Sequence, residues 1–277
     1  MDSLKIALLE KTGHDHGFEH VLSANPQAVC LASARHPTRV TVTGTADDGY
    51  QVYFETTSAT LPGELARSFP QWTPVDNHFL IPGNTELATL LLRAAGLSRA
   101  LPNQAARSYE DAVSEELAAL PPETLHTEVE RMVRQRIGQQ KFREAMLTYW
   151  GGACAVTGLT LPDALRASHA KPWAECASDA ERLDVFNGLL LTANLDALFD
   201  RFLISFDTQG RLLLSPALTA ADLCLLGIRP DMKLRWLAGE HQPYLQFHRE
   251  RLSGSRACVP HRRASNADAA IKTPAAS

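Results

Sequence analysis

The spacing of apolar residues in the first hundred positions predicts a sheet accompanied by a helix. A run of small and apolar residues, Ala28–Ala34, is expected to form a buried strand. Two β-rich runs, Arg39–Thr45 and Tyr50–Thr56, flank the turn sequence ADDG and predict a hairpin. A short strand is expected at Phe79–Ile81, and apolar residues at helical spacing predict a helix over Thr85–Ala100. The N-terminal part is therefore predicted to be a mixed α and β domain.

A second helical pattern occupies the middle of the chain. Residues 101–122 are interpreted as a proline-bounded connector that contains an acidic helical piece, Tyr109–Ala119. The Pro-Pro pair at its end predicts a boundary. A long helix is expected to begin at Glu123 or Thr127 and to end at Trp150, with an apolar stripe on one side and basic residues on the others.

After this helix the pattern predicts two short strands, a helix and a hairpin. One apolar strand ends in His169, a second begins at Asn187, and a helix that carries carboxylates follows directly. Two further β-rich runs, Leu203–Phe206 and Arg211–Leu214, flank a turn sequence and predict the hairpin.

The composition indicates a globular protein of a reducing compartment. The chain has 277 residues, of which 45% are hydrophobic. No apolar run approaches the roughly 18 residues of a membrane span, and the first residues lack the features of a signal peptide. The five cysteines are odd in number and scattered, which argues against a disulfide framework. We therefore expect a cytoplasmic protein with no membrane partner.

The charge distribution is compatible with a nucleic-acid ligand without requiring one. The formal net charge is −4, with acidic residues in excess before about residue 120 and basic residues in excess after about residue 215. A protein that is acidic overall can bind an anion when its cleft is locally positive. Net charge therefore neither supports nor excludes nucleic acid as a partner.

The motifs that carry chemistry lie close together in one segment. They are CAVTG at Cys154–Gly158, SHAKPW at Ser168–Trp173, NGLLL at Asn187–Leu191 and LFDR at Leu198–Arg201. Hydrolysis of a phosphodiester with a metal ion needs a base to activate water, a polar residue to hold that base, and anionic ligands for the cation. The motifs supply these side chains in this order. Over residues 140–215 the chain resembles the HNH endonucleases of the ββα-metal class.

This resemblance implies a fold class and a domain organisation. We expect an α+β protein with a C-terminal ββα-metal core, an N-terminal mixed α/β domain and a disordered C-terminal tail, because the last residues are small, polar and basic. The predicted boundaries are 1–105 for the N-terminal domain, 106–126 for a connector, 127–252 for the nuclease domain and 253–277 for the tail. The N-terminal domain would recognise substrate or regulate the nuclease.

The resemblance assigns catalytic roles to a histidine and an asparagine. His169 matches the general base for the attacking water, and a neutral imidazole suits this role because its ordinary pKa lies near 6.5. Asn187 matches the asparagine that bridges the two strands, positions the base and approaches the metal. The alternatives are a structural histidine bonded to the backbone and a turn asparagine before Gly188.

Two aspartates are the predicted metal ligands. Asp196 stands where many relatives carry a histidine, and Asp200 lies four residues further on, so both share one helix face. Carboxylate oxygens suit Mg²⁺ or Mn²⁺ better than Ni²⁺ or Zn²⁺. Ser168 replaces an acidic ligand of many relatives, which leaves the two carboxylates, Asn187 and water to complete the shell. Alternatively, Asp196 or Asn194 caps the helix and Asp200 pairs with an arginine.

The segment also contains a cysteine and several cations. Cys154 has Thr157 at the second position of a C-x-x-C spacing, so no structural zinc is expected and the cysteine is predicted to be packed in the core. Lys171, Arg201 and Arg166 are predicted to bind substrate phosphates. The alternative is that they are solvated surface charges.

The predicted function is hydrolysis of DNA phosphodiester bonds with one divalent metal ion. DNA is the expected partner, with a second copy of the chain or a defence-system protein as further candidates. Restriction or phage defence is the setting suggested by similar domain layouts. The alternative is a catalytically degenerate HNH fold that acts as a DNA-binding or partner-regulated module.

Overall fold

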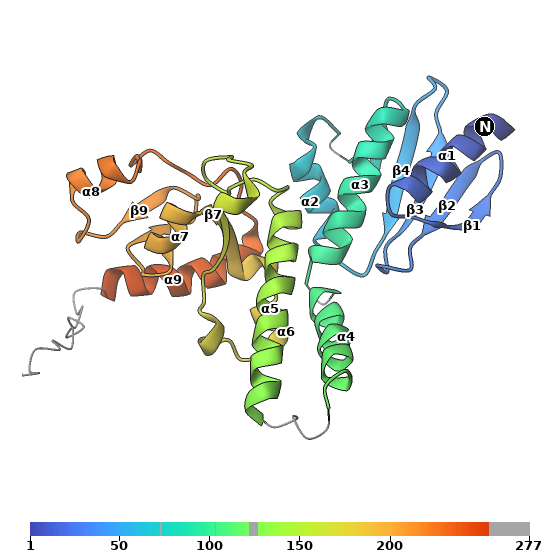
Figure 1. Ribbon diagram of the computed structural model, residues 1–277. Coiled ribbons are helices and arrows are strands. Elements are labelled where there is room, and N and C mark those ends of the chain that lie inside the picture. The colour runs from blue at the N-terminus through green and yellow to red at the C-terminus, as the bar shows by residue number, and fades with distance from the viewer. Residues whose placement is uncertain (73, 103, 122–126, 255–277) are drawn as a thin grey trace, which may run out of the picture.

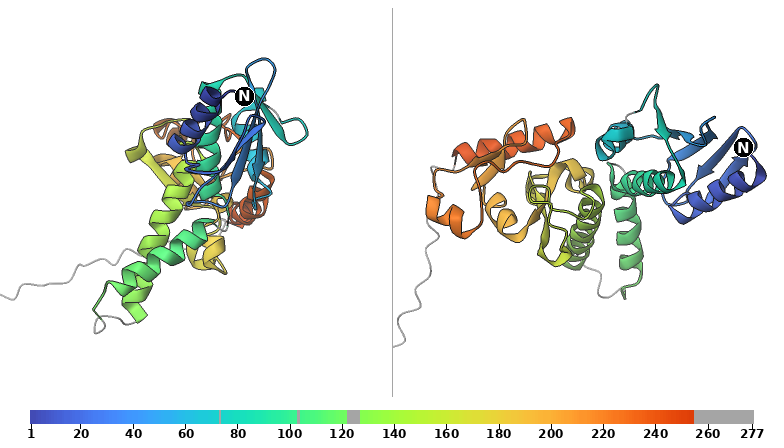
Figure 2. Two further views of the ribbon diagram at one scale, coloured as in Figure 1. Left: turned by 90° about the vertical axis from the view of Figure 1, so that its right-hand side faces the viewer. Right: turned by 90° about the horizontal axis from the view of Figure 1, so that it is seen from above.

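The computed structural model describes residues 1–72, 74–102, 104–121 and 127–254, which form an α+β fold with an N-terminal and a C-terminal region (Figure 1). The N-terminal region contains an antiparallel sheet of five strands in sequential order. Figure 2 shows helices α1 and α3 on the same side of this sheet. The elements are α1 (Ser3–Asp15), β1 (His20–Ala24), β2 (Ala28–Ala32), β3 (Arg39–Gly44), β4 (Tyr50–Glu55), α2 (Leu61–Ser68), η1 (Pro70–Trp72), β5 (His78–Ile81) and α3 (Asn84–Ala100).

Alternating burial along the central strands explains how the sheet packs. Val40, Val42 and Val52 are fully buried, whereas their neighbours along the strands are partly or fully exposed. Side chains that alternate along a strand point to opposite faces, so this face forms the core with the helices. The predicted hairpin is confirmed, because β3 and β4 pair in the register Val42↔Val52. The predicted helix over residues 85–100 is confirmed as α3.

Three N-terminal elements were not predicted from the sequence. Helix α1 runs through Gly13, where a Cβ would overlap the side chain of Leu31. Strand β1 is exposed at every position and therefore has no hydrophobic alternation. Helix α2 contains Pro62 in its first turn, where proline is tolerated, followed by Gly63.

Two helices connect the N-terminal sheet to the C-terminal region. They are α4 (Gln104–Ala118) and α5 (Thr127–Tyr149), which lie side by side in Figure 1. Helix α4 begins at Gln104, earlier than the helical piece that was predicted to begin at Tyr109. Helix α5 confirms the long helix predicted to end at Trp150. Contacts from α5 reach α3 and α4 as well as the strands that follow it. Helix α5 is therefore shared between the two regions. The domain boundaries predicted above stay predictions.

The C-terminal region begins with a two-stranded hairpin followed directly by a helix. Strands β6 and β7 pair antiparallel, with His169 opposite Gly188. The second strand starts at Gly188 rather than at Asn187, which ends a short 3-10 turn. The elements are η3 (Pro162–Ala164), β6 (Leu165–His169), η4 (Trp173–Glu175), α6 (Asp179–Arg182), η5 (Val185–Asn187), β7 (Gly188–Thr192), α7 (Ala193–Phe199), β8 (Ile204–Phe206), β9 (Leu212–Leu214), α8 (Ala220–Leu225), η6 (Gly239–His241) and α9 (Gln242–Gly254).

The remaining predictions about this region concern the second hairpin and the C-terminal tail. The second hairpin is confirmed as β8 and β9. Helix α9 extends to Gly254, and residues 255–277 of the predicted tail lie outside the described residues. None of the helices in the described part of the chain combines the length and apolar character that a membrane span requires.

Candidate functional site

The hairpin β6–β7 and helix α7 carry most of the residues of the candidate site. Gly188 is buried and has no room for a larger side chain, since a Cβ there would lie 2.6 Å from Cζ of Phe142 and 2.7 Å from the carbonyl oxygen of Ser168. Glycine therefore allows helix α5 to pack against the hairpin beside His169. Because α7 begins immediately after β7, its first turn is fixed relative to both strands.

An open pocket of about 480 Å³ lies where α5, β6, α7 and α9 meet. It brings together the predicted base, the two predicted carboxylate ligands and two arginines, but not Asn187, the third predicted metal ligand. A second histidine, His248 on α9, also lines it. The residues that matter for the chemistry are Phe142, Arg143, Arg166, His169, Asp196, Asp200 and His248.

His169 is held in one orientation by a hydrogen bond and two aromatic rings. Its Nε2 lies 2.8 Å from the carbonyl oxygen of Arg182, which can only accept, so Nε2 carries the proton and Nδ1 is the basic nitrogen. The ring stacks on Phe142 at 3.7 Å between centroids, and the ring of Trp173 meets it edge-on at 5.7 Å. Burial lowers the pKa of His169 to about 4, so the imidazole is neutral at neutral pH.

The stacking predicts that Phe142 positions the histidine ring. Replacing Phe142 with leucine keeps an apolar side chain but removes the flat surface, so the rate of any reaction that uses His169 is expected to fall about tenfold. Phe79→Leu, which changes a buried ring in the N-terminal sheet, is the matched control. Single-turnover rates of both variants at equal folded fraction test this expectation. Equal rates would mean that the stack does not orient the base.

Asp196 and Asp200 both line the pocket, with different surroundings. Oδ1 of Asp196 accepts a hydrogen bond of 2.6 Å from the hydroxyl of Ser168. Burial, and next the negative charge of Asp196, raise the pKa of Asp200 to about 6, while Arg201 opposes this. Within the described ranges, no group of three or more His, Cys, Asp or Glu side chains is arranged to hold a metal ion. The protein therefore offers two carboxylates at this position.

The alternative in which Asp196 or Asn194 caps helix α7 is wrong. The N-cap of α7 is Thr192, and no side chain makes the capping hydrogen bond. The amide of Asn194 donates instead to the carbonyl oxygen of Leu226, 2.8 Å away. The carboxylate of Asp196 is therefore not engaged by the end of its own helix.

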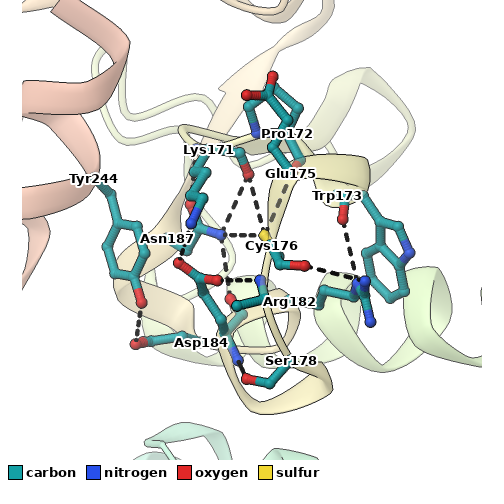
Figure 3. A network of polar contacts seen from close by, with 12 residues as sticks. Lys171, Pro172, Trp173, Glu175, Cys176, Ser178, Arg182, Asp184, Asn187 and Tyr244 are labelled. Carbon is teal, nitrogen blue, oxygen red and sulfur yellow. Dashed lines mark hydrogen bonds and ion pairs between the residues drawn. The ribbon is translucent and has the colours of Figure 1, made fainter.

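Asn187 is fully buried and is not among the residues that line the pocket; its side chain lies within a network of polar contacts (Figure 3). Its Oδ1 accepts from the backbone N–H of Lys171 at 2.8 Å, and its Nδ2 donates to the carbonyl oxygens of Lys171 and Glu181 and to the sulfur of Cys176. The side chain joins the start of β7 to the loop that follows β6. This fully buried position argues against the metal contact that the sequence predicted for Asn187, and it agrees with a bridge between the strands.

Removing this bridge is expected to destabilise the fold. Asn187→Ala removes the side-chain partner of the backbone N–H of Lys171 and of the carbonyl oxygen of Glu181, so the free energy of unfolding should fall by about 3 kcal/mol. Asn194→Ala, which removes one bond to Leu226, should cost about 1 kcal/mol and serves as the control. Urea denaturation of both variants measures the difference. Equal losses would contradict the central role of Asn187.

The three predicted phosphate-binding cations are not equally placed. Arg166 lines the pocket, where it donates to the carbonyl oxygens of Asp163 and Leu165. Lys171 forms an ion pair of 2.7 Å with Glu181, and neither residue is among those that line the pocket. Arg201 is exposed and is also not among those lining residues.

Sequence reasoning missed three residues of the pocket. Arg143 donates to the carbonyl oxygens of Leu165 and Pro162, which ties α5 to the start of β6. His248 stacks on Phe199 at 3.8 Å, and its nitrogens lie 3.0 Å from Oγ of Ser205 and 2.9 Å from the carbonyl oxygen of Phe199. Phe142 and Arg143 lie within residues 140–215, but the resemblance assigned them no role. His248 comes from α9, outside that segment, so spacing within the segment could not reveal it.

Cys154 is fully buried, as expected for a packed residue. Its sulfur accepts hydrogen bonds from the backbone N–H groups of Val156 and Thr157, both at 3.4 Å. The cysteine thus stabilises the turn of the CAVTG motif.

The comparison with known protein families agrees with this arrangement. Residues 154–207 match the family described as HNH endonuclease, and this segment runs from the CAVTG turn through β6, β7 and α7 to the end of β8. This part of the chain belongs to the HNH endonuclease family. A search of curated proteins gives no match to the chain. Family membership implies a nuclease-type function that depends on a metal ion and acts on nucleic acid.

Proposed function

We propose that this protein is an endonuclease that hydrolyses DNA phosphodiester bonds with one divalent cation. The observation that carries the proposal is the shared pocket of His169, Asp196 and Asp200 within the segment that matches the HNH family. A neutral base beside two carboxylates supplies the parts that metal-assisted hydrolysis requires.

In this proposal His169 accepts a proton from the attacking water at Nδ1. The carbonyl oxygen of Arg182, bonded to Nε2, then stabilises the imidazolium that forms. A pKa near 4 makes His169 a weak base in the free protein. The negative charge of a bound phosphate favours the charged imidazole and therefore raises this pKa when substrate is present.

The donor set of the pocket fits a hard divalent cation. Proteins bind Mg²⁺ through one or two carboxylates, with water and substrate phosphate completing the shell. Asp196 and Asp200 supply the two carboxylates, and Ser168 occupies only Oδ1 of Asp196. Their mutual repulsion, which contributes to the raised pKa of Asp200, is relieved by a positive ion. A bound cation would neutralise charge on the scissile phosphate and on the leaving oxygen. Mg²⁺ or Mn²⁺ suits this set better than Ni²⁺ or Zn²⁺.

The arginines of the pocket are proposed to orient the substrate. Arg143 and Arg166 hold the loop before β6 through backbone carbonyls, and each guanidinium has more N–H groups than these bonds use. Their remaining donors suit DNA phosphates. Arg201 is a further candidate from the exposed end of α7. The ion pair of Lys171 with Glu181 makes Lys171 a weaker candidate.

The finer aspects of the function rest on analogy. Residues 1–105 are proposed to recognise substrate or to regulate cleavage, and restriction or phage defence is proposed from domain layout alone. Incubating the full chain with plasmid DNA and with a structured RNA, each in Mg²⁺ or Mn²⁺, tests the substrate class. We expect cleavage of DNA. Cleavage of RNA alone would contradict the proposal while leaving a nuclease.

A further inference from the structure

A second pocket, about 260 Å³ in volume, lies at the C-terminal end of helix α5. Helices α2 and α3 lie beside this end of α5 in Figure 1. The residues that define the pocket are Glu64, Arg67, Arg93, Trp150, Arg235 and Trp236, none of which lines the catalytic pocket. Its volume is slightly below the range of about 300–1,000 Å³ typical of sites for drug-sized ligands, so it suits a small one.

The pocket has an excess of positive charge. It contains three guanidinium groups and one carboxylate, and that carboxylate, on buried Glu64, pairs with Arg67. No carboxylate of the described residues lies within ion-pair distance of Arg93 or Arg235. Arg93 is half-buried, and burial lowers the pKa of its guanidinium, whereas Arg235 is exposed. A bound anion would pair with both charges and would offset the cost of burying Arg93.

The hydrogen bonds of these arginines leave donors for a ligand. Arg93 donates to Oγ of Ser68 at 3.0 Å and to the carbonyl oxygens of Thr148 and Tyr149 at 2.5 and 2.7 Å. The Nη2 of Arg235 donates to the carbonyl oxygens of Trp150 and Ala153, each 2.8 Å away. The carboxyl end of a helix carries about half a negative charge, which is less than the two positive charges gathered there. Each guanidinium also has five N–H groups, so both retain free donors.

Aromatic surfaces lie next to these charges. The rings of Trp150 and Trp236 stack at 4.6 Å between centroids, and the guanidinium of Arg235 lies 4.5 Å from the centroid of Trp236. Trp150 is fully buried, and its indole N–H has no hydrogen-bond partner in the described structure. Aromatic rings beside arginines are the surfaces on which proteins stack nucleobases.

We propose that this pocket binds a nucleotide, with the phosphate on Arg93 and Arg235 and the base against Trp236, the half-buried member of the tryptophan pair. The nucleotide is either free in solution or part of a DNA strand that extends to the pocket. The phosphate explains the excess of guanidinium groups, and the base explains why they lie against indole rings. This site is separate from the proposed nuclease centre and does not depend on it.

Tryptophan fluorescence of the full-length protein in EDTA tests the proposal. The probes are deoxyadenosine monophosphate, deoxyadenosine, inorganic phosphate and a short single-stranded DNA. We expect saturable quenching by the nucleotide or the DNA, with deoxyadenosine and phosphate binding at least tenfold more weakly. Tighter binding of the mononucleotide identifies a free ligand, and tighter binding of the oligonucleotide identifies a strand. Equal binding of inorganic phosphate and the nucleotide would overturn the proposal.

Two variants locate the binding. Arg235→Gln is expected to weaken nucleotide binding at least tenfold, whereas Arg229→Gln, which removes an exposed arginine paired with Asp231, is expected to leave it unchanged. His169→Ala should also bind normally, which separates this site from the nuclease. Quenching that is insensitive to Arg235→Gln would overturn the proposal. If Arg235→Gln folds poorly, the wild-type protein still provides a test, because the absence of saturable quenching by every probe would also overturn it.

Discussion

Replacing His169 with alanine is expected to slow DNA cleavage by about 10²- to 10⁴-fold, the usual contribution of a general base. The substitution removes the only histidine of the pocket that has a ring nitrogen free of hydrogen bonds, since both nitrogens of His248 are engaged. Single-turnover cleavage of a labelled duplex at saturating protein measures this rate. DNA binding should persist, because the arginines that line the pocket are unchanged.

The matched control is His14→Ala, which removes an exposed histidine from helix α1. We expect this variant to cleave at the wild-type rate. Thermal melting of both variants shows whether the fold survives. A folded His169→Ala protein with full activity would remove His169 from the mechanism, and the base would then have to be sought among other groups of the pocket.

Replacing Asp200 with asparagine is expected to weaken Mn²⁺ binding by more than about tenfold, since even groups that only support a metal ligand contribute about 10- to 100-fold to affinity. The amide keeps the shape of the side chain but removes one of two negative charges. Isothermal titration with Mn²⁺ measures the affinity. Asp231→Asn, an exposed carboxylate paired with Arg229, is the control and should bind Mn²⁺ as the wild type does.

The same carboxylate predicts how metal binding depends on pH. The pKa of Asp200 is raised to about 6, so below this pH the group is protonated and must lose its proton to bind a cation. Affinity for Mn²⁺ should therefore rise about tenfold per pH unit up to about pH 6 and then level off. Asp200→Asn should lack this dependence. An unchanged Mn²⁺ titration in the variant would exclude Asp200 from the metal shell.

The raised pKa also has a consequence for stability without metal. A carboxyl whose folded pKa lies above its ordinary value favours folding only while it is protonated. Between about pH 4 and pH 6 the contribution of Asp200 therefore decreases as pH rises, and above pH 6 it stays unfavourable. His169 has the opposite effect, because its pKa is lowered to about 4, so its contribution increases as pH rises from about 4 to 6.5.

The parts of the fold that could be predicted are those with strong local periodicity. The pairing of β3 with β4 follows from two β-rich runs around a turn, and α3 follows from apolar residues at helical spacing. Strand β1 could not be predicted, because an exposed edge strand lacks alternation. Helix α1 was missed; it contains Gly13, which weakens a helix but is needed here for close packing on Leu31.

The candidate site also contains some residues that the local sequence predicts and others that depend on tertiary packing. The motif order predicted which side chains of the hairpin and α7 would share a pocket, and His169, Asp196, Asp200 and Arg166 do so. The sequence could not show that the side chain of Asn187 is hydrogen-bonded to backbone groups of Lys171 and Glu181, since these bonds depend on the conformation of the loop between the strands. Nor could it show that an aromatic ring from α5 stacks on the base, because that contact is made only by tertiary packing.

The most direct test of the central claim is a nicking assay on supercoiled plasmid DNA. The full-length protein is incubated with Mg²⁺, with Mn²⁺ and with EDTA, beside the folded His169→Ala variant. We expect nicked or linear DNA in either metal ion, and intact plasmid in EDTA and with the variant. Cutting that persists in EDTA would contradict the dependence on a metal ion. The absence of cutting by the wild-type protein in both metal ions would contradict a one-metal DNA endonuclease and would favour a DNA-binding or partner-regulated HNH fold.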